Sequence, residues 1–154
     1  MNKIALSLAS GLGIGYSPWA SGTFGTLWGI LFYYLLRNFS PFHFFIAICT
    51  LFILSIPIVH LAEKELGSHD SGVIILDEIL GYLVAVWALP FNFWTVSLGF
   101  ALFRLFDIWK PFPISYLDKK INGAIGVIID DIAAGLIANL ILWVLWYNYS
   151  NFLM

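Results

Sequence analysis

The sequence predicts an all-α, polytopic membrane protein: a bundle of apolar helices with one helical hairpin that turns at Pro90-Phe91-Asn92. Composition is the first reason, because 61% of the residues are hydrophobic and only 10% are charged, whereas soluble domains carry about 25% charged residues. The placement of the charges is the second. Four stretches contain no Asp, Glu, Lys or Arg, and each exceeds the ~20 residues that cross a bilayer: 4–36, 38–62, 79–103 and 132–154.

The first half of the chain is expected to form an entry segment and two helices within a single domain, 1–154. Residues 3–21 are apolar and glycine-rich, lack a cleavable signal pattern, and break at Ser17-Pro18. Helices are expected over 23–37 and 41–62. Ser40 and Pro41 suit the N-cap and first position of the second helix, and Pro57 predicts a kink in it.

The second half alternates polar loops with apolar helices. Residues 63–72 and 110–123 are expected to be loops. Helices are expected over 73–89, 93–109 and 124–147, with the break at 90–92 between the first two. The sequence contains no basic patch large enough to indicate nucleic-acid binding, and it gives no indication of the oligomeric state.

The path of 73–109 decides where the two polar loops lie. A single crossing would put them on opposite faces of the membrane, whereas a hairpin puts them on the same face. The positive-inside rule favours the hairpin, because every cationic residue except Arg37 then lies on one side: Lys3, Lys64, Arg104, Lys110, Lys119 and Lys120. We therefore expect a multi-pass protein whose polar loops face the cytoplasm.

Acidic residues at the ends of the apolar helices are the main candidates for chemistry. Carboxylates in such places are unfavourable unless they are paired, hydrated or bound to metal. A divalent cation would balance the charge that Arg104 and Lys110 leave uncompensated, and carboxylate oxygens suit Mg²⁺, Mn²⁺ or Ca²⁺ rather than zinc. The candidate metal ligands are Asp77, Glu78, Asp107, Asp130 and Asp131.

Helical spacing predicts which way these acids point. Small residues allow membrane helices to pack closely, and two stripes of small residues carry an acid: Asp77 with Gly81, Ala85 and Ala88, and Asp130 with Ala134 and Ala138. We therefore expect Asp77 and Asp130 to face each other inside the bundle. Glu78 and Asp131 lie about 100° further round their helices, where each could bind the metal or support a ligand.

Other polar residues have both a functional and a structural interpretation. Arg104 and Lys110 could bind phosphate, or could form i, i+3 salt bridges with Asp107. His69, in a polar loop, could bind phosphate or protonate a leaving group, or could simply be solvated. The segment 21–26 precedes a helix, whose N-terminal amides attract phosphate. Its glycines could instead serve helix packing.

Four motifs, in order, resemble those of the phosphatidylglycerophosphatase A family. They cover nearly the whole chain, from about Tyr16 to Leu140, and the departure that we note is Ser21, where proline is expected. The motifs are Gly22-Thr23-Phe24-Gly25-Thr26, then His69-Asp70-Ser71-Gly72-Val73-Ile74-Ile75-Leu76-Asp77-Glu78-Ile79-Leu80-Gly81, then Phe103-Arg104-Leu105-Phe106-Asp107-Ile108-Trp109-Lys110-Pro111-Phe112-Pro113-Ile114, and Gly126-Val127-Ile128-Ile129-Asp130-Asp131-Ile132-Ala133-Ala134-Gly135.

The resemblance implies a Mg²⁺-dependent, all-helical phosphatase of the bacterial inner membrane. Its substrate would be the phospholipid phosphatidylglycerophosphate, and its products phosphatidylglycerol and inorganic phosphate. On this interpretation the catalytic residues are Asp77, Asp107, Asp130 and Asp131, with Glu78 as a further metal ligand. The substrate phosphate would contact Arg104, Lys110, Thr23, Thr26 and His69.

Two other classes of protein also fit an acidic membrane bundle. A small cation transporter would use intramembrane acids along an ion path, but the middle of every long apolar stretch here is uncharged, which favours a site near the membrane surface. A purely structural membrane protein would have no use for a cluster of uncompensated acids. The route of hydrolysis stays open between water activated by the metal and an aspartyl-phosphate intermediate.

Overall fold

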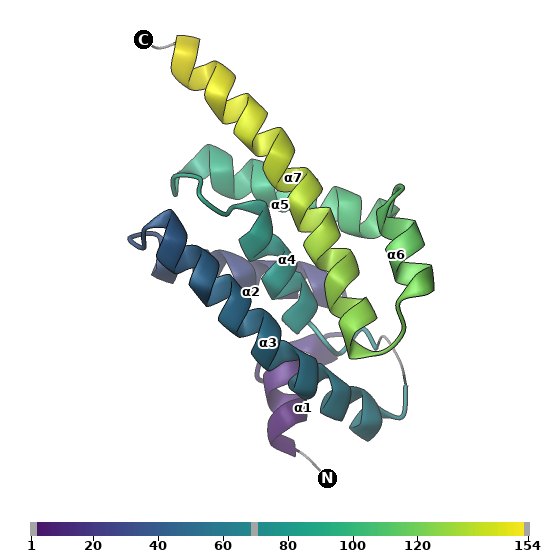
Figure 1. Ribbon diagram of the computed structural model, residues 1–154. Helices are drawn as coiled ribbons and strands as arrows, with labels where there is room; N and C mark the ends of the chain where they lie inside the picture. The colour runs from purple at the N-terminus through teal and green to yellow at the C-terminus, as the bar shows by residue number, and fades with distance from the viewer. Residues whose placement is uncertain (1–2, 69–70, 153–154) are drawn as a thin grey trace.

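A computed structural model describes residues 3–68 and 71–152, and this part of the chain contains helices and no strand. Figure 1 shows their arrangement. The elements are α1 (Lys3–Ala9), a 3-10 helix (Ile14–Tyr16), α2 (Ser21–Leu36), α3 (Pro41–Leu66), α4 (Leu76–Ala85), α5 (Phe93–Trp109), α6 (Ile114–Lys120) and α7 (Ala124–Phe152). The predicted all-α class is confirmed.

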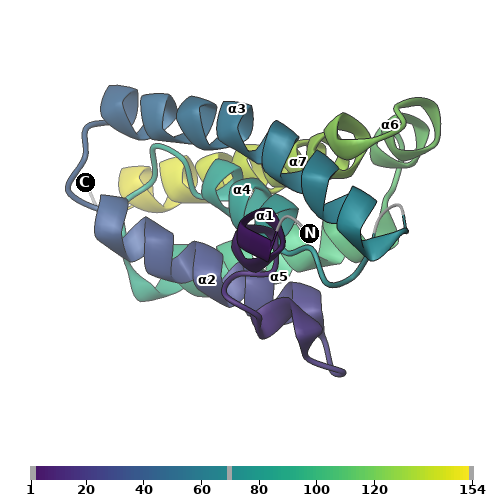
Figure 2. The same ribbon diagram turned by 90° about the horizontal axis from the view of Figure 1, so that it is seen from below.

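Helix α4 forms the centre of the bundle. It packs against α2, α3, α5 and α7, and the view in Figure 2 shows these helices around it. Nine of its ten residues are buried, and Glu78 is the exception. Because the helix is short and enclosed, both of its ends are positioned by the longer helices around it.

Glycines allow the helices to approach α4 closely. A Cβ atom on Gly29 of α2 would lie 2.9 Å from the Tyr82 ring, and one on Gly81 would lie 2.5 Å from the Phe103 ring. A Cβ atom on Gly135 of α7 would overlap the carbonyl oxygen of Gly81. Small residues thus bring α2, α5 and α7 onto the central helix, as expected for packing between membrane helices.

Helices α4 and α5 form the predicted hairpin, but its turn is longer than expected. Helix α4 ends at Ala85, and α5 begins at Phe93 after the Asn92 side chain accepts a hydrogen bond from the Thr95 amide at 2.9 Å. Carbonyls at the end of α4 and in the turn find partners on other helices. The Tyr33 hydroxyl donates to the Leu89 carbonyl at 3.0 Å, and the Asn139 amide donates to Ala85 and Trp87 at 2.9 and 3.0 Å.

Several predicted boundaries are corrected by the structure. Helix α2 begins at Ser21 rather than 23, α4 spans Leu76–Ala85 rather than 73–89, and α7 continues to Phe152 rather than 147. Helix α3 begins as predicted at its Ser40 cap but continues to Leu66. Its last turn is polar yet made of good helix formers, and it stops at Gly67, whose φ of 65° suits glycine.

The predicted loop 110–123 contains a helix, α6. Polarity suggested a loop there, but the segment after Pro113 has enough helix-forming residues for two turns, and Ile114 is fully buried. Burial of this apolar residue fixes the short helix beside α7, against which it packs.

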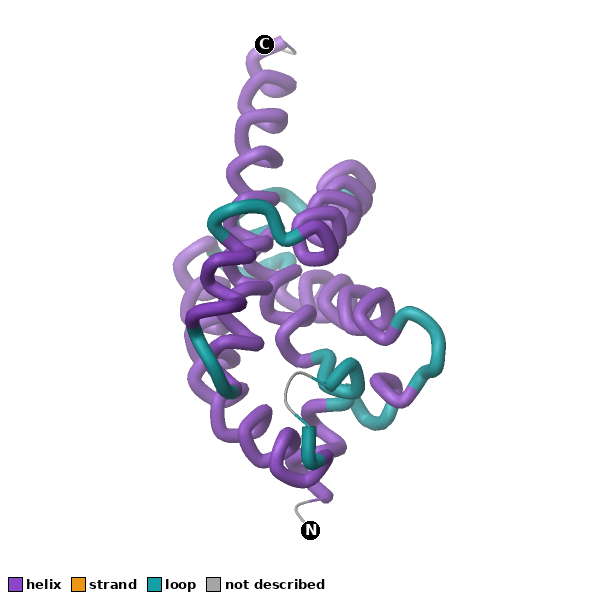
Figure 3. The backbone as a smooth tube through the Cα atoms, turned by 90° about the vertical axis from the view of Figure 1, so that its right-hand side faces the viewer, coloured by secondary structure: helices purple, strands orange, loops and turns teal. Residues whose placement is uncertain are grey.

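Helices α3 and α7 are long and apolar enough to cross a membrane. Their most apolar windows have mean hydropathies of 2.5 and 2.0. In α3 only 22% of that window is buried, so most of its apolar side chains face outward, as in a helical membrane protein. Figures 1 and 3 show the N-terminus and the C-terminal end of α7 at opposite ends of the molecule.

Candidate metal and phosphate site

Three carboxylates from two helices converge at one end of the bundle. Asp77 and Glu78 occupy the first turn of α4, and Asp131 lies in the second turn of α7. Each offers an oxygen, and these oxygens all lie within 4.8 Å of one another. Asp77 and Asp131 are buried, with 7% and 4% of their surface exposed. Such a set of hard oxygen donors matches what Mg²⁺, Mn²⁺ or Ca²⁺ requires.

The contact between Gly81 and Gly135 sets the separation of these acids. Gly81 lies one turn after Asp77, and Gly135 lies one turn after Asp131. Side chains at both positions are excluded, because a Cβ atom on Gly81 would lie 2.7 Å from the Asp131 carbonyl oxygen and one on Gly135 would overlap Gly81. The two backbones therefore meet directly, and the acids beside them are held together.

The electrostatics of this cluster are unfavourable without a cation. Glu78 Oε2 and Asp131 Oδ2 are buried and have no hydrogen-bond partner in the described part of the chain. Burial raises the pKa of Asp77, which lies in the short helix α4 outside the two candidate spans, and repulsion from Glu78 raises this pKa further. Buried carboxylate oxygens without partners fit a bound divalent cation, which would supply the missing charge.

The two cations near the cluster are held by three other acids. Arg104 forms an ion pair with Asp107 one turn later on α5. Lys110, at the end of α5, bonds to Asp130 of α7 and to Asp118 of α6, the latter at 2.8 Å. Partial burial lowers the pKa of Lys110, but these hydrogen bonds outweigh that effect, so its pKa lies above the usual range.

All five predicted acids therefore gather at one end of the bundle, but in two groups. Asp107 pairs with Arg104, whose Nη1 lies beside the same Gly22 position as Glu78 Oε1, and Asp130 is the neighbour of Asp131 on α7. Asp107 and Asp130 are paired with cations, whereas the other three face one another. The i, i+3 pair between Arg104 and Asp107 is present. Lys110 bonds to Asp118 and Asp130 instead of Asp107.

The predicted partner of Asp77 requires a correction. Small-residue stripes suggested that Asp77 would meet Asp130, but the acid whose oxygens approach Asp77 is Asp131. Asp130 is also buried, and it turns toward Lys110. The reason is the contact between Gly81 and Gly135, because it brings to α4 the face of α7 that carries Asp131.

The first turn of α2 completes this end of the bundle. A Cβ atom on Gly22 would lie 2.6 Å from Glu78 Oε1 and 2.7 Å from Arg104 Nη1. Gly22 itself was absent from our predicted contact residues, although it belongs to the glycine–threonine motif. Thr23 is half-buried beside it. Thr26 is fully buried, and its hydroxyl donates to the Gly22 carbonyl at 2.8 Å.

Two predicted features remain to be placed. His69 lies outside the described residues. The segment 21–26 serves helix packing, as its alternative interpretation required, because Gly25 lies against Ile75 and Glu78. The backbone of the same segment also lies next to Arg104. The segment therefore both packs against α4 and borders the site.

Comparison with known proteins identifies the family of this chain. The family model described as phosphatidylglycerophosphatase A matches residues 7–146. A phosphatidylglycerophosphatase A of Escherichia coli (strain K12) is 40% identical over 144 residues, which cover 92% of this chain and 83% of the relative. A phosphatidylglycerophosphatase A of Haemophilus influenzae is 36% identical over 151 residues, which cover 96% of this chain and 91% of the relative. No solved structure gives a significant match. The chain belongs to the phosphatidylglycerophosphatase A family.

Proposed function

We propose that this protein hydrolyses the terminal phosphate monoester of phosphatidylglycerophosphate, with Mg²⁺ as its cofactor. Water supplies the oxygen that the phosphate gains, the bond between phosphorus and the glycerol oxygen breaks, and the products are phosphatidylglycerol and inorganic phosphate. Family membership supports the substrate class. The observation that carries the proposal is the set of three converging carboxylates, of which Asp77 and Asp131 are buried, while Glu78 and Asp131 each have a buried oxygen without a hydrogen-bond partner in the described part of the chain.

The residues that would hold the cation are Asp77, Glu78 and Asp131, and the ion-paired Asp107 and Asp130 lie at the same end of the bundle. When bound, a divalent cation supplies positive charge to phosphate oxygens and acidifies water. The protein's own contribution is to keep the three carboxylates close together despite their repulsion. The glycine contact between α4 and α7 does this.

Arg104 and Lys110 are proposed to bind the substrate phosphate. Their side chains are 16% and 29% exposed, so both charges border the site without being sealed from a ligand. Each is already oriented by an acid, Asp107 for Arg104 and Asp130 for Lys110. Positive charge positioned beforehand stabilises the transferring phosphoryl group without reorganisation.

The remaining predicted residues have supporting roles in this proposal. Thr23 is half-buried beside Gly22, which approaches Arg104, so its hydroxyl could orient the phosphate. Thr26 acts through the helix, since its hydroxyl donates to Gly22. His69 stays a candidate proton donor. Asp77, Asp107, Asp130 and Asp131 stay the candidate catalytic acids, and one of them could form an aspartyl-phosphate intermediate.

We further propose that the protein crosses the bacterial inner membrane several times, with the acidic site at the cytoplasmic face. Helices α3 and α7 are suited to span the bilayer. The C-terminal ends of α3 and α5, which carry cationic residues, lie toward one end of the molecule, away from the C-terminal end of α2 (Figures 1 and 2). The positive-inside rule then assigns that end to the cytoplasm, where the lipid head group reaches the site while its acyl chains stay in the bilayer.

Phosphate release by the purified protein in detergent micelles tests the proposal. We expect release from phosphatidylglycerophosphate, its loss after chelation of divalent ions, and its recovery when Mg²⁺ is added. Absence of release under all three conditions would contradict the proposed activity. Release that is unchanged by chelation would contradict the metal requirement alone. Metal-driven ion flux in proteoliposomes without phosphate release would favour a cation transporter instead.

A further inference from the structure

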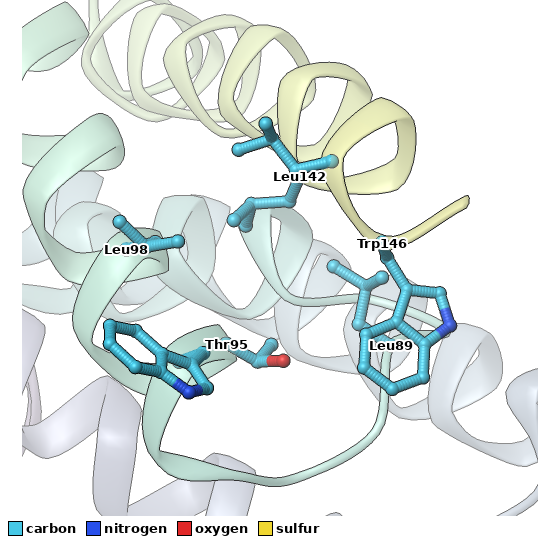
Figure 4. Close-up of a pocket in the computed structure, with 7 residues that line it drawn as sticks. Leu89, Thr95, Leu98, Leu142 and Trp146 are labelled. Carbon is cyan, nitrogen blue, oxygen red and sulfur yellow. The ribbon is translucent and has the colours of Figure 1, made fainter. Parts of the chain in front are cut away.

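An apolar cavity lies between α5, α7 and the hairpin turn, away from the acids. Its volume is about 340 Å³, within the lower range of ligand-binding pockets. Figure 4 shows Leu98 and Thr95 from α5, Leu142 and Trp146 from α7, and Leu89 from the turn around one common space. Trp94 and Leu145 complete the lining. The phosphate chemistry described above uses none of these residues.

The cavity is preformed, because its walls are fixed by interactions outside it. The turn that carries Leu89 is held by the Tyr33 hydroxyl and the Asn139 amide, which bond to its carbonyls. Thr95 is fixed at the start of α5 by the Asn92 cap. The Leu142 side chain lies 3.6 Å from the position of a Cβ atom on Gly99, so α5 and α7 are in contact at the cavity's edge.

The depth of the cavity matches one leaflet of a bilayer. Thr95 precedes Asp107 by 12 residues on α5, about 18 Å at the helical rise. Leu142 follows Asp131 by 11 residues on α7, about 17 Å. Half of the hydrocarbon core is about 15 Å thick. A lipid whose phosphate lies at the acids would therefore place the ends of its acyl chains near the cavity.

The cavity is also continuous with the apolar exterior of a candidate membrane span. Leu142, Leu145 and Trp146 all lie within the candidate span of α7, Ala124–Asn148. Leu145 and Leu98 are 48% and 39% exposed, so the cavity opens at the surface where acyl chains would lie. An apolar, flexible chain that enters from the bilayer would suit this lining and opening.

We propose that this cavity binds the distal part of an acyl chain of the phospholipid substrate, and that it sets a preference for chain length. The proposal rests on the proposed phosphatase activity. A bound chain end would add apolar contact far from the phosphate, so a long-chain substrate would bind more tightly than a short-chain one. Loss of contact to about two methylene groups corresponds to roughly tenfold in binding.

The test replaces leucines that differ in whether they line the cavity. Leu145→Trp and Leu98→Trp fill it from α7 and α5. Leu140→Trp is the matched control, because Leu140 is an exposed leucine on the same helix as Leu145 and does not line the cavity. The measurement is kcat/KM for phosphatidylglycerophosphates with short and with long acyl chains, in mixed micelles of fixed lipid fraction.

We expect the long-to-short ratio of kcat/KM to fall about tenfold in both cavity variants and to stay at the wild-type value in Leu140→Trp, with short-chain activity retained in all three. Unchanged ratios in active cavity variants would overturn the proposal, as would an equal fall in Leu140→Trp. So would a change in oligomeric state without a change in the ratio, since the cavity would then bind a second copy. If the wild-type protein released no phosphate from either lipid, the proposed activity itself would fail.

Discussion

Buried polar groups differ between the two ends of the α4–α5 hairpin: those at the turn are hydrogen-bonded, whereas some at the other end are not. At the turn, carbonyls left free by the end of α4 are satisfied by Tyr33 and Asn139. At the other end, Glu78 and Asp131 keep buried oxygens without partners in the described part of the chain. Evolution can complete a polar network with side chains, as the turn shows. We therefore propose that a ligand completes the network at the open end, so that the fold serves as scaffold at one end and as site at the other.

Replacing Asp131 tests this comparison with the largest expected effect. Asp131→Asn keeps the shape of the side chain but removes one of three charges that would hold the cation. We expect phosphate release to fall by on the order of 10²–10³-fold, as for loss of one preorganised electrostatic group. Asp77→Asn should behave similarly. Glu65→Gln, on an exposed part of α3, is the control. Full activity in both aspartate variants would show that these acids do not belong to the site.

Replacing Gly135 separates the geometry of the site from its charge. Gly135→Leu would force side-chain atoms into the Gly81 carbonyl, and overpacking of this kind costs about 1–3 kcal/mol of stability. We expect a lower unfolding temperature and reduced activity, although every acid is retained.

Gly72→Ala is the control for that substitution. A Cβ atom there would meet Ser21 Oγ at 3.6 Å, an ordinary contact. Wild-type stability and activity in Gly135→Leu would show that the close approach of α4 and α7 does not set the acid cluster.

Removal of the Lys110 charge should have a smaller effect, on substrate affinity. Charged hydrogen bonds contribute about 1.5–3 kcal/mol, and Arg104 remains in Lys110→Gln. We expect KM for the phospholipid to rise about tenfold, which corresponds to the lower end of that range. Lys120→Gln is the matched control, because Lys120 bonds to Tyr116 and lies on α6. Equal KM values in the two variants would argue against phosphate binding by Lys110.

The smallest effect is expected at the turn. Tyr33→Phe removes the hydrogen bond to the Leu89 carbonyl and leaves the acids untouched. The loss should reduce the free energy of unfolding by about 0.5–1.5 kcal/mol, measured by thermal or chemical denaturation, while phosphate release under stable conditions stays unchanged. A loss of activity as large as that of Asp131→Asn would erase the functional distinction between the two ends.

Much of this architecture follows from the placement of charges and prolines. The hairpin was predictable because Pro90 and Asn92 interrupt an uncharged stretch, and the Asn92 cap begins α5 at Phe93 as predicted. Helix α6 was not predictable, because its stability depends on burying Ile114 against the rest of the fold. A polar sequence alone does not reveal that contact.

The candidate site was predictable as a set of residues but not as an arrangement. Charge at the ends of apolar helices identified the five acids. Which of them face one another depends on the rotation of α7 about its axis, and the Gly81–Gly135 contact sets that rotation. The sequence contains both glycines, yet Ala134 and Ala138 offered an equally good packing stripe. The packing of the helices in the structure is needed to show that Asp131, and not Asp130, faces Asp77.

Equilibrium binding of Mn²⁺, followed by electron paramagnetic resonance on the purified protein in detergent, tests the central claim most directly. The free-ion signal should fall on titration with wild-type protein and with Glu65→Gln, and Mg²⁺ should restore it by competition. Asp77→Asn and Asp131→Asn should take up far less Mn²⁺ while remaining folded. Undiminished Mn²⁺ binding by the two aspartate variants, or none by the wild-type protein, would contradict a divalent cation held by these carboxylates.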